Sequence, residues 1–377
     1  MYYFLDAFVV KRGTYKNESL MGKRKPILWT ILGLAGSAFL ADRLFRGSTF
    51  KGHSDNLEGG EFKNTGGGKN SISRTVGKIM LNFDKWELWP KAYEKPLAKI
   101  QPSYFDEENQ VKVYFIGHAT CLIQWNGLNI LTDPMFSRSA GPLGKMGPAR
   151  KAPPGVNIQG LPPIDMVLLS HNHYDHFDMD SLEYIGASQH KSPIVITGLG
   201  NAKLVKRTGL HPAVELDWGE SITYKGWQVY FEECKHSSGR AFSDQNKSLW
   251  GSFVIENPKG QKVYFGGDSA YGGHYRRIHR KHGPMDLSFL PIGAYRPKEA
   301  FGDIHMNPEE AINAHKDLHS KETIAIHHGT FQLTLEGRFD PIKELMEAME
   351  KESEPISPFY SLKNGASKLI DLEKKDV

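Results

Sequence analysis

The sequence of 377 residues predicts an α/β fold in which two mixed β-sheets pack face to face and helices cover their outer faces. Two observations support this fold class. From residue 111 onward, short apolar or alternating runs recur between turn residues, and helical stretches lie between many of them. The runs of the first half follow one another largely as hairpins, whereas those of the second half alternate with helices, so we expect mixed sheets.

Ten short runs are expected to be strands, because each is apolar or alternates apolar with polar residues and is bounded by turn residues. They are residues 111–116, 121–125, 128–131, 165–169, 193–197, 228–232, 251–256, 262–266, 287–291 and 323–327. Helices are expected near residues 180–186, 200–208, 273–282, 307–318 and 340–351. These elements form one main domain, residues 111–377, with no internal repeat at a fixed short period.

The N-terminal segment, residues 1–51, resembles a signal-anchor. The basic cluster Lys23–Lys25 precedes about fifteen mostly apolar residues, Ile27–Ala41, and Asp42 closes the run. A cleaved secretory signal and a buried core helix are the alternatives, but no clean cleavage site follows. We therefore expect a membrane-anchor helix in a bacterial inner membrane, with the folded body on the non-cytoplasmic side. The residues before Met21 lack helical periodicity, and Met21 is expected to be the native start.

Residues 52–110 should connect this anchor to the main domain. Residues 52–73 are rich in Gly, Asn and Ser and predict a linker or an extended arm. Apolar residues then recur at helical spacing between Val76 and Trp86, which predicts a helix packed on the core, with membrane contact as the alternative.

The charge distribution argues against a nucleic-acid partner. Residues 1–51 contain nine Lys and Arg against three Asp and Glu, whereas the rest of the chain contains 38 against 40. A surface that follows phosphates needs clustered Lys and Arg on the folded domain itself. The only cysteines, Cys121 and Cys234, lie in expected strands and should be buried free thiols. The sequence leaves a homodimer as a possibility.

A cluster of metal-binding residue types follows the apolar run at residues 165–169. The stretch SHNHYDHFD places His171, His173, Asp175 and His176 within six residues, at the point where a strand ends. A single histidine there would more often be structural, but four unpaired donors together would be costly to desolvate without a cation. Histidine and carboxylate without thiolate favour Zn²⁺, with Mn²⁺ or Fe²⁺ as alternatives, and two metal positions are implied.

Three further donors, His236, Asp268 and His327, each stand where another apolar run stops. Strand ends are where α/β folds gather their sites. We therefore assign His171, His173 and His236 to one metal and Asp175, His176 and His327 to the other, with Asp268 able to bridge them. A solvated polar loop is the alternative for the His171–His176 stretch, and these distant donors make it less plausible.

The pattern His-x-His-x-Asp-His followed by distant His, Asp and His resembles the metallo-β-lactamase superfamily. Longer stretches are similar to its N-acylphosphatidylethanolamine phospholipase D branch, in order and over nearly all of residues 52–340: IGHATCLIQWNGLNILTDPMFS, MGPARK, LPPIDMVLLSHNHYDHFD, ELDWGE, DQNKSLWGSF, FGGDSAY, LPIGAYRP, HMNPEEAINAH and IHHGTFQLT. The resemblance implies an αββα sandwich, two zinc ions, and cleavage of a phospholipid to phosphatidic acid and N-acylethanolamine.

The resemblance also assigns roles to individual positions. The family motif Ile-His-x-Gly-Thr-Phe selects His327 over His328 as the last ligand, and strand alternation agrees. The chain departs from the family in SSGR after His236, where Arg240 alone keeps a positive charge, and in Met179 and Ile304, where the animal enzymes have polar residues. These departures concern the lipid head group and not the metal chemistry.

The implied mechanism is attack on phosphorus by a hydroxide shared by two zinc ions. Asp175, Asp268 and His305 are the expected catalytic residues. The residues expected to bind substrate are Tyr174, Arg240, Tyr295 and His305. Packing is the alternative for Tyr174, Tyr295 and His305, and His118 in GHAT is expected to be structural or to orient a ligand.

Two other functions compete with a membrane phospholipid hydrolase. The first is a two-metal hydrolase of a soluble phosphodiester or a lactone. The second is a membrane-tethered scaffold whose metal site is a relic, which the complete set of seven donors argues against. Zinc content measured together with turnover on lipids and on soluble esters separates the three functions.

Overall fold

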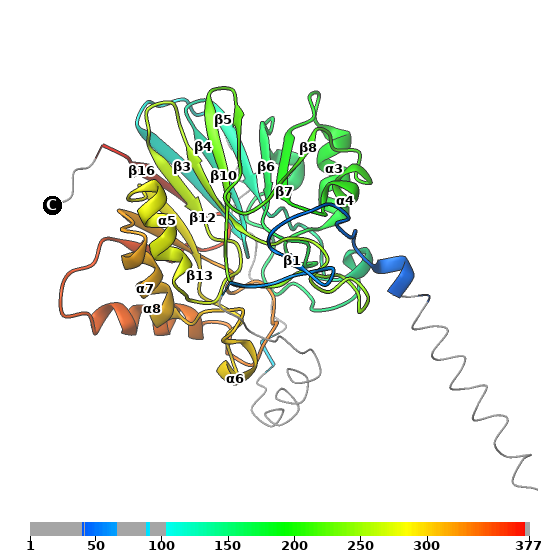
Figure 1. Cartoon of the computed structure of the whole chain (residues 1–377). Helices are drawn as coiled ribbons and strands as arrows, with labels where there is room; N and C mark the ends of the chain where they lie inside the picture. The colour runs from blue at the N-terminus through cyan, green and yellow to red at the C-terminus, as the bar shows by residue number, and fades with distance from the viewer. Residues whose placement is uncertain (1–39, 41, 66–87, 91–102, 374–377) are drawn as a thin grey trace, which may run out of the picture. The chain divides into compact units, whose positions relative to one another are not determined.

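Two seven-stranded mixed sheets dominate the computed structural model, which describes residues 40, 42–65, 88–90 and 103–373 (Figure 1). The chain divides into two units, Met1–Phe45 and Arg46–Val377, and the second contains both sheets. In spatial order the first sheet is β16 (Ser367–Asp371), β3 (Gln110–Gly117), β4 (Thr120–Trp125), β5 (Leu128–Thr132), β6 (Met166–Leu169), β7 (Ile194–Gly198) and β8 (Ala213–Leu216).

The second sheet has the spatial order β15 (Phe359–Tyr360), β14 (Glu322–Ile326), β13 (Leu287–Pro291), β12 (Lys262–Phe265), β11 (Ser252–Glu256), β10 (Trp227–Glu232) and β9 (Ser221–Tyr224). In both sheets antiparallel neighbours at one side give way to parallel ones: β5 to β8 are parallel in the first sheet, and β12 to β15 in the second. The predicted pair of mixed sheets is confirmed.

Strand alternation separates three apolar layers. Between the sheets, alternate residues of β3 such as Val113 and Phe115 meet residues of β10 and β11 such as Phe231 and Phe253. The intervening residues face outward, so Tyr114 and Val167 pack with α3 (Met179–Ser188) and α4 (Ala202–Lys206). The outer face of the second sheet packs against α5 (His274–His282), α7 (Pro308–Asp317) and α8 (Asp340–Glu350). The result is the predicted αββα sandwich.

The helices lie where helical spacing predicted them. Asn307 ends the preceding loop as an N-cap whose side chain accepts from Glu310 N, and Glu310 reaches back to the Asn307 N–H, which closes a capping box at the start of α7. The sequence did not predict several short elements: the strands β8, β9, β15 and β16, the helix α6 (Lys298–Phe301), and the 3₁₀ turns η2 (Pro142–Gly144) and η3 (Ile158–Gly160). Cys121 and Cys234 are free and buried, as predicted.

The arm before the main domain is more ordered than a linker. The hairpin β1 (Leu57–Glu58) and β2 (Glu61–Phe62) forms within the stretch predicted as linker or extended arm. The Phe62 side chain is completely buried in the layer between the sheets, and Phe62 N donates to Asn246 O, which ties the arm to the body. The helix expected between Val76 and Trp86 lies outside the described residues.

The predicted membrane-anchored localisation is wrong, because no helix in the described part of the chain is long and apolar enough to cross a membrane. The expected span, Ile27–Ala41, lies outside the described residues except for Leu40. Its run of about fifteen apolar residues is also shorter than the ~20 that a bilayer core of about 30 Å requires.

Candidate metal centre

The loop that follows β6 brings four predicted donors to the end of the first sheet. His171 and His173 follow the strand directly, and the chain then turns, with His176 N and Phe177 N both donating to His173 O at 3.2 and 2.8 Å. This turn brings the His176 ring to 4.3 Å from the His171 ring, centroid to centroid, and places Asp175 in a group with His176 and His327. Because α3 begins immediately afterwards at Met179, the loop is held between a buried strand and a helix.

Three histidine nitrogens converge in the first donor group. The Nε2 atom of His171 lies 2.8 Å from Nδ1 of His173, and that Nδ1 lies 3.2 Å from Nε2 of His236. His236 follows β10, and its other nitrogen, Nδ1, donates to Ile304 O at 2.9 Å, which directs Nε2 into the centre. The predicted trio of His171, His173 and His236 is therefore brought together from two sheets.

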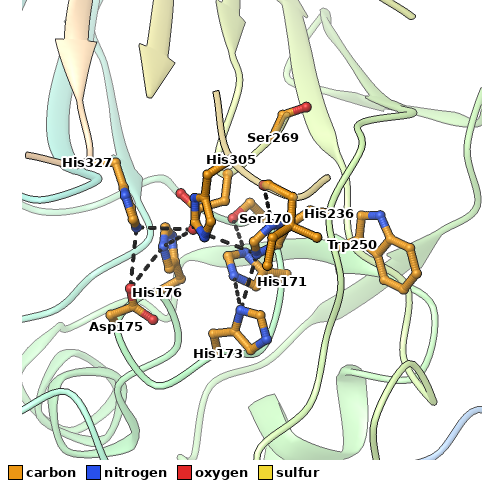
Figure 2. A network of polar contacts seen from close by, with 12 residues as sticks. Ser170, His171, His173, Asp175, His176, His236, Trp250, Ser269, His305 and His327 are labelled. Carbon is orange, nitrogen blue, oxygen red and sulfur yellow. Dashed lines mark hydrogen bonds and ion pairs between the residues drawn. The ribbon is translucent and has the colours of Figure 1, made fainter. Parts of the chain in front are cut away.

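The second donor group surrounds two carboxylates (Figure 2). Asp175 Oδ2 lies 3.5 Å from His176 Nε2 and 3.4 Å from His327 Nε2. Asp268 Oδ2 lies 3.1 Å from His176 Nε2, 3.0 Å from His327 Nε2 and 3.7 Å from His236 Nε2. Asp268 thus contacts donors of both groups, which is the position that a bridging carboxylate requires.

A turn of the backbone, and not strand alternation, directs the His327 side chain to the centre. Strand β14 ends at Ile326, and His327 adopts the left-handed backbone conformation with φ of 61°. Its N–H donates to His118 O at 2.8 Å, which holds this turn. His328 points elsewhere and stacks on Phe115, with ring centroids 5.4 Å apart. A non-glycine residue in this conformation is strained, and such strain is concentrated at functional sites.

The chemistry and the placement of these donor atoms fit divalent cations. The His171 Nε2 and His236 Nε2 atoms lie 2.8 and 3.2 Å from the same atom, His173 Nδ1. At these distances the three nitrogens cannot all carry a proton toward one another, so at least one lone pair points into the space between the rings. The Nε2 atom of His176 and the Oδ1 atom of Asp268 are buried and have no hydrogen-bond partner. Unpaired buried donors of these types are the ligands of a metal centre.

In the metal-free protein the histidines of the two donor groups differ in their protonation state. Burial holds the pKa of His173 at about 3, and burial also keeps the pKa values of His171 and His236 low, so the first group is neutral. Burial lowers the pKa of His327 as well, but Asp268 and Asp175 more than offset it and raise that pKa to about 9. Burial also lowers the pKa of His176, but the charges of Asp268 and Asp175 outweigh burial and hold that pKa well above its usual value.

Protonated His176 and His327 occupy the place of cations beside the two carboxylates. Burial alone would raise the pKa of Asp268, but the charges of His176 and His327 hold it well below its usual value. The pKa of Asp175 is low for the same reason, with a further hydrogen bond from His118. The second donor group therefore has a strong negative potential that only protons or metal ions can balance.

Asp133, at the end of β5, orients one ligand of each donor group. Its Oδ2 accepts from His176 Nδ1 at 2.7 Å and from Ser170 Oγ at 2.6 Å, and Ser170 Oγ lies 2.9 Å from His171 Nδ1. These contacts occupy the Nδ1 atoms of both rings and leave each Nε2 for a metal. Sequence reasoning missed Asp133 and Ser170, although Asp133 also follows an apolar run, the signal that found Asp268 and His327.

His118 supports the other carboxylate, in agreement with its expected orienting role. Its Nε2 lies 2.8 Å from Asp175 Oδ2, and its backbone N–H donates to Thr330 Oγ1 at 2.9 Å. It could also join Asp175, His176 and His327 as a fourth donor, because the ligand atoms of these four residues lie within 4.8 Å of one another.

Of the predicted substrate-binding residues, the structure brings only His305 into the donor cluster. Its Nδ1 lies 3.9 Å from Asp268 Oδ2 and has no hydrogen-bond partner, and its ring stacks on His327 at 5.3 Å. The Tyr295 hydroxyl instead donates to Glu344 of α8 at 2.7 Å, and the side chain is almost completely buried. These contacts do not place Tyr295 at the metal centre.

Arg240 braces the ligand loop through two backbone carbonyls. Its Nη1 donates to Asn172 O at 3.1 Å and to Phe177 O at 2.8 Å, one carbonyl within the run of four donors and one directly after it. Its guanidinium lies over the half-buried Tyr174 ring, 3.9 Å from the centroid, so the two predicted substrate-binding residues are paired with each other. Both side chains therefore help to position the ligand loop.

Comparison with known proteins identifies the family. A model described as the beta-lactamase superfamily domain matches residues 128–328. An uncharacterised protein of Mycobacterium tuberculosis is 36% identical over 286 residues, 74% of this chain and 76% of that protein. The N-acyl-phosphatidylethanolamine-hydrolyzing phospholipase D 1 of Caenorhabditis elegans is 33% identical over 271 residues, 68% of this chain and 75% of that enzyme.

A solved structure of an isothiocyanate hydrolase from Delia radicum gut bacteria has the same fold. Its TM-score is 0.54 at 20% identity, and the match covers 69% of this chain and 99% of that one. The fold, the clustered His and Asp donors and these relatives lead to one assignment. The chain is a metal-dependent hydrolase that belongs to the metallo-β-lactamase superfamily, in the branch that contains the N-acylphosphatidylethanolamine-hydrolysing phospholipases D.

Proposed function

We propose that the protein is a zinc-dependent phosphodiesterase of the phospholipase D type, which converts N-acylphosphatidylethanolamine-like phospholipids to phosphatidic acid and N-acylethanolamine. The observation that supports it most is the position of Asp268, whose Oδ2 lies 3.0 to 3.7 Å from donors of both groups. A carboxylate between two donor groups suits a two-metal centre, which clamps the attacking and leaving oxygens of a phosphodiester. The similarity to the Caenorhabditis elegans enzyme favours a phospholipid substrate.

The residues that would hold the metals form two sets, which correspond to the two donor groups. His171, His173 and His236 would hold one ion, Asp175, His176 and His327 the other, and Asp268 would contact both. Ligands of nitrogen and oxygen without sulfur suit zinc. When bound, the two ions would supply an acidified water as nucleophile and positive charge for the phosphoryl oxygens.

His305 is the side chain best placed to contact the reacting phosphate. Burial holds its pKa well below the usual value, so the imidazole is neutral and donates a hydrogen bond without carrying charge. Its Nδ1 has no partner in the protein and lies 3.9 Å from Asp268 Oδ2. A neutral N–H at this point would bind a phosphoryl oxygen or the leaving oxygen and would keep it in line with the attacking water.

The carboxylates have a second task in this proposal. Asp175 accepts from His118, and Asp268 is held between His176 and His327, so neither carboxylate can turn away from the centre. A fixed carboxylate next to the nucleophilic water can accept its proton as the phosphorus–oxygen bond forms. A membrane phospholipid as partner, and a homodimer, remain predictions.

The test is a panel of substrates with two readouts. Purified protein is given N-acylphosphatidylethanolamine, phosphatidylcholine, a soluble phosphodiester and a lactone, and phosphatidic acid is measured by mass spectrometry with and without a chelator. We expect phosphatidic acid from the N-acylated lipid, loss of turnover with chelator, about two zinc ions per chain, and loss of metal and turnover in Asp268→Ala. Equal rates on the soluble diester would support the soluble-substrate alternative, and metal without any turnover would support a scaffold.

A further inference from the structure

A separate cavity of about 300 Å³ lies beside the start of α8, and none of the seven predicted metal ligands lines it. Its polar wall includes Arg338, Lys363 and Asn364, and its apolar wall includes Phe339, Ile342 and Leu362. The residues that line it include two cations and no Asp or Glu. The cavity therefore offers positive charge together with apolar surface.

The positive charge is held in place at the cavity wall. Arg338 Nε donates to Gly329 O at 3.1 Å, and the guanidinium lies over the Phe339 ring, 5.2 Å from its centroid. Lys363 is exposed. His328 adds a buried polar group, because its Nε2 has no hydrogen-bond partner and the residue is only 6% exposed. An oriented guanidinium next to a lysine is a recurrent arrangement for binding a phosphate or carboxylate.

An apolar groove continues from this cavity along α8. Phe339 and Ile342 line both hollows, and Met346 extends the groove by one more turn of the helix. Phe339, the N-cap of α8, and Met346 are 58% and 59% exposed, and Ile342 lies between them at steps of three and four residues, so the three side chains share one side of the helix. At about 1.5 Å per helical residue, this stripe is roughly 10 Å long.

We propose that the cavity and the groove form a second binding site, for an amphiphile with one anionic head group and one alkyl chain. The cations at the cavity would bind the head group, and the stripe from Phe339 to Met346 would cover the chain. The groove beyond the cavity is lined by Glu347, Glu350 and Lys343, and Lys343 lies 3.7 Å from Glu347, so the lining has a net negative charge that would repel an anion. This difference in charge between the two hollows fixes the orientation of the bound molecule.

The site is distinct from the metal centre although the chain links them. His328 follows the ligand candidate His327 directly, but the two rings face different surroundings, the metal centre and Phe115. An amphiphile bound beside α8 should therefore not need a metal ion. This separates the proposal from the proposed lipid hydrolysis, which depends on the centre.

Decyl phosphate, kept below its micelle concentration, is the probe for a calorimetric test. Lys363→Gln and Arg338→Gln should each weaken its binding about tenfold, and Met346→Asp should do the same through the alkyl chain. The matched controls are Lys206→Gln on α4 and Leu369→Asp on β16, both exposed and outside the two hollows, and they should leave the affinity within about twofold.

Two further ligands and one further variant decide between explanations. Inorganic phosphate and octyl glucoside, which carry only the head group or only the chain, should each bind at least about a hundredfold more weakly. Asp268→Ala, tested with chelator present, should bind decyl phosphate as the wild type does. Equal binding of inorganic phosphate or octyl glucoside, unchanged affinity in Lys363→Gln and Met346→Asp, or loss of binding in Asp268→Ala would overturn the proposal.

Discussion

Asp133 Oδ2 lies 2.7 Å from Nδ1 of His176, and both side chains are completely buried. The same oxygen accepts the hydroxyl of Ser170, which contacts His171 Nδ1 in turn. One carboxylate outside the predicted ligand set therefore controls which nitrogen two ligands present. Because those ligands belong to different donor groups, a change at Asp133 should affect both metal positions together.

Asp133→Asn should weaken metal binding about 10- to 100-fold, which is the usual cost of removing a group that orients a ligand. If the amide oxygen takes the place of Oδ2 and keeps the two donors there, the NH₂ group takes the place of Oδ1 and faces the Ser170 N–H, which donates to Oδ1 at 2.8 Å. Apparent dissociation constants from metal titration of the chelated protein measure the loss.

Asp165→Asn is the matched control for this substitution. Asp165 also accepts a backbone N–H and pairs with a cation, Lys225, but it lies at the start of β6, away from the ligands. Its replacement should leave the metal affinity unchanged. Equal affinity in Asp133→Asn and the wild type would show that the ligands do not depend on Asp133.

His327→Ala should lower the metal content, whereas His328→Gln should not, because only His327 Nε2 lies near Asp175 and Asp268. Removal of one of the donors of the second group should leave about one tightly bound ion per chain. Elemental analysis after gel filtration measures the content, and circular dichroism checks that both variants fold. A similar loss of metal in both variants would contradict the assignment of His327.

The sandwich could be predicted because strand periodicity survives in a buried core. Val113 and Phe115 face one layer and Tyr114 the other, so alternation along one strand already separates the core between the sheets from the helix-covered face. The hairpin at residues 57–62 was missed because two-residue strands leave no periodic signal, and contacts with the body stabilise it, among them the burial of Phe62 and its hydrogen bond to Asn246 O.

The candidate ligands could be predicted because strand ends meet at one edge, and the ends of β6, β12 and β14 do meet there. The contacts of the other polar side chains could not. Arg240 is a charged residue in a polar loop, which suits substrate binding, yet its partners are the carbonyls of Asn172 and Phe177. Backbone acceptors are available at every residue, so sequence contains no signal for which one a guanidinium will use.

Arg240→Gln should destabilise the ligand loop by about 2 to 4 kcal/mol, because two charged hydrogen bonds and a cation–π contact with Tyr174 are lost. Urea unfolding of the chelated protein measures this free energy. Arg280→Gln on α5 is the control, since that side chain is exposed, and it should change the unfolding free energy by less than about 0.5 kcal/mol. If Arg240→Gln were as stable as the control variant, Arg240 would not stabilise the ligand loop.

The metal-free protein should lose stability as the pH rises from 6.5 to 9.5. His327 has a folded pKa of about 9, above its ordinary value of 6.5. Its contribution is therefore fully present below pH 6.5 and disappears as the pH passes through 9, a loss of up to about 3 kcal/mol. Urea unfolding at several pH values with chelator present measures it, and His327→Gln should flatten the dependence.

Metal binding should show the opposite pH dependence, and only at one of the two positions. Zinc at the second group must displace protons from His176 and His327, whose pKa values are raised in the metal-free protein. Each displaced proton makes the apparent affinity rise about tenfold per pH unit below the pKa. At the first group, His171, His173 and His236 have lowered pKa values and are already neutral, so binding there releases no protons.

Titration of the chelated protein with Zn²⁺ at pH 6.5, 7.5 and 8.5 tests this difference between the two positions. One binding step should keep its affinity, and the other should strengthen by about 10- to 100-fold per unit, according to whether one or two protons leave. His327→Gln should remove part of the pH dependence of the second step because one of the two protons is then absent. Two steps with the same pH dependence would mean that the carboxylates do not confine the protons to His176 and His327.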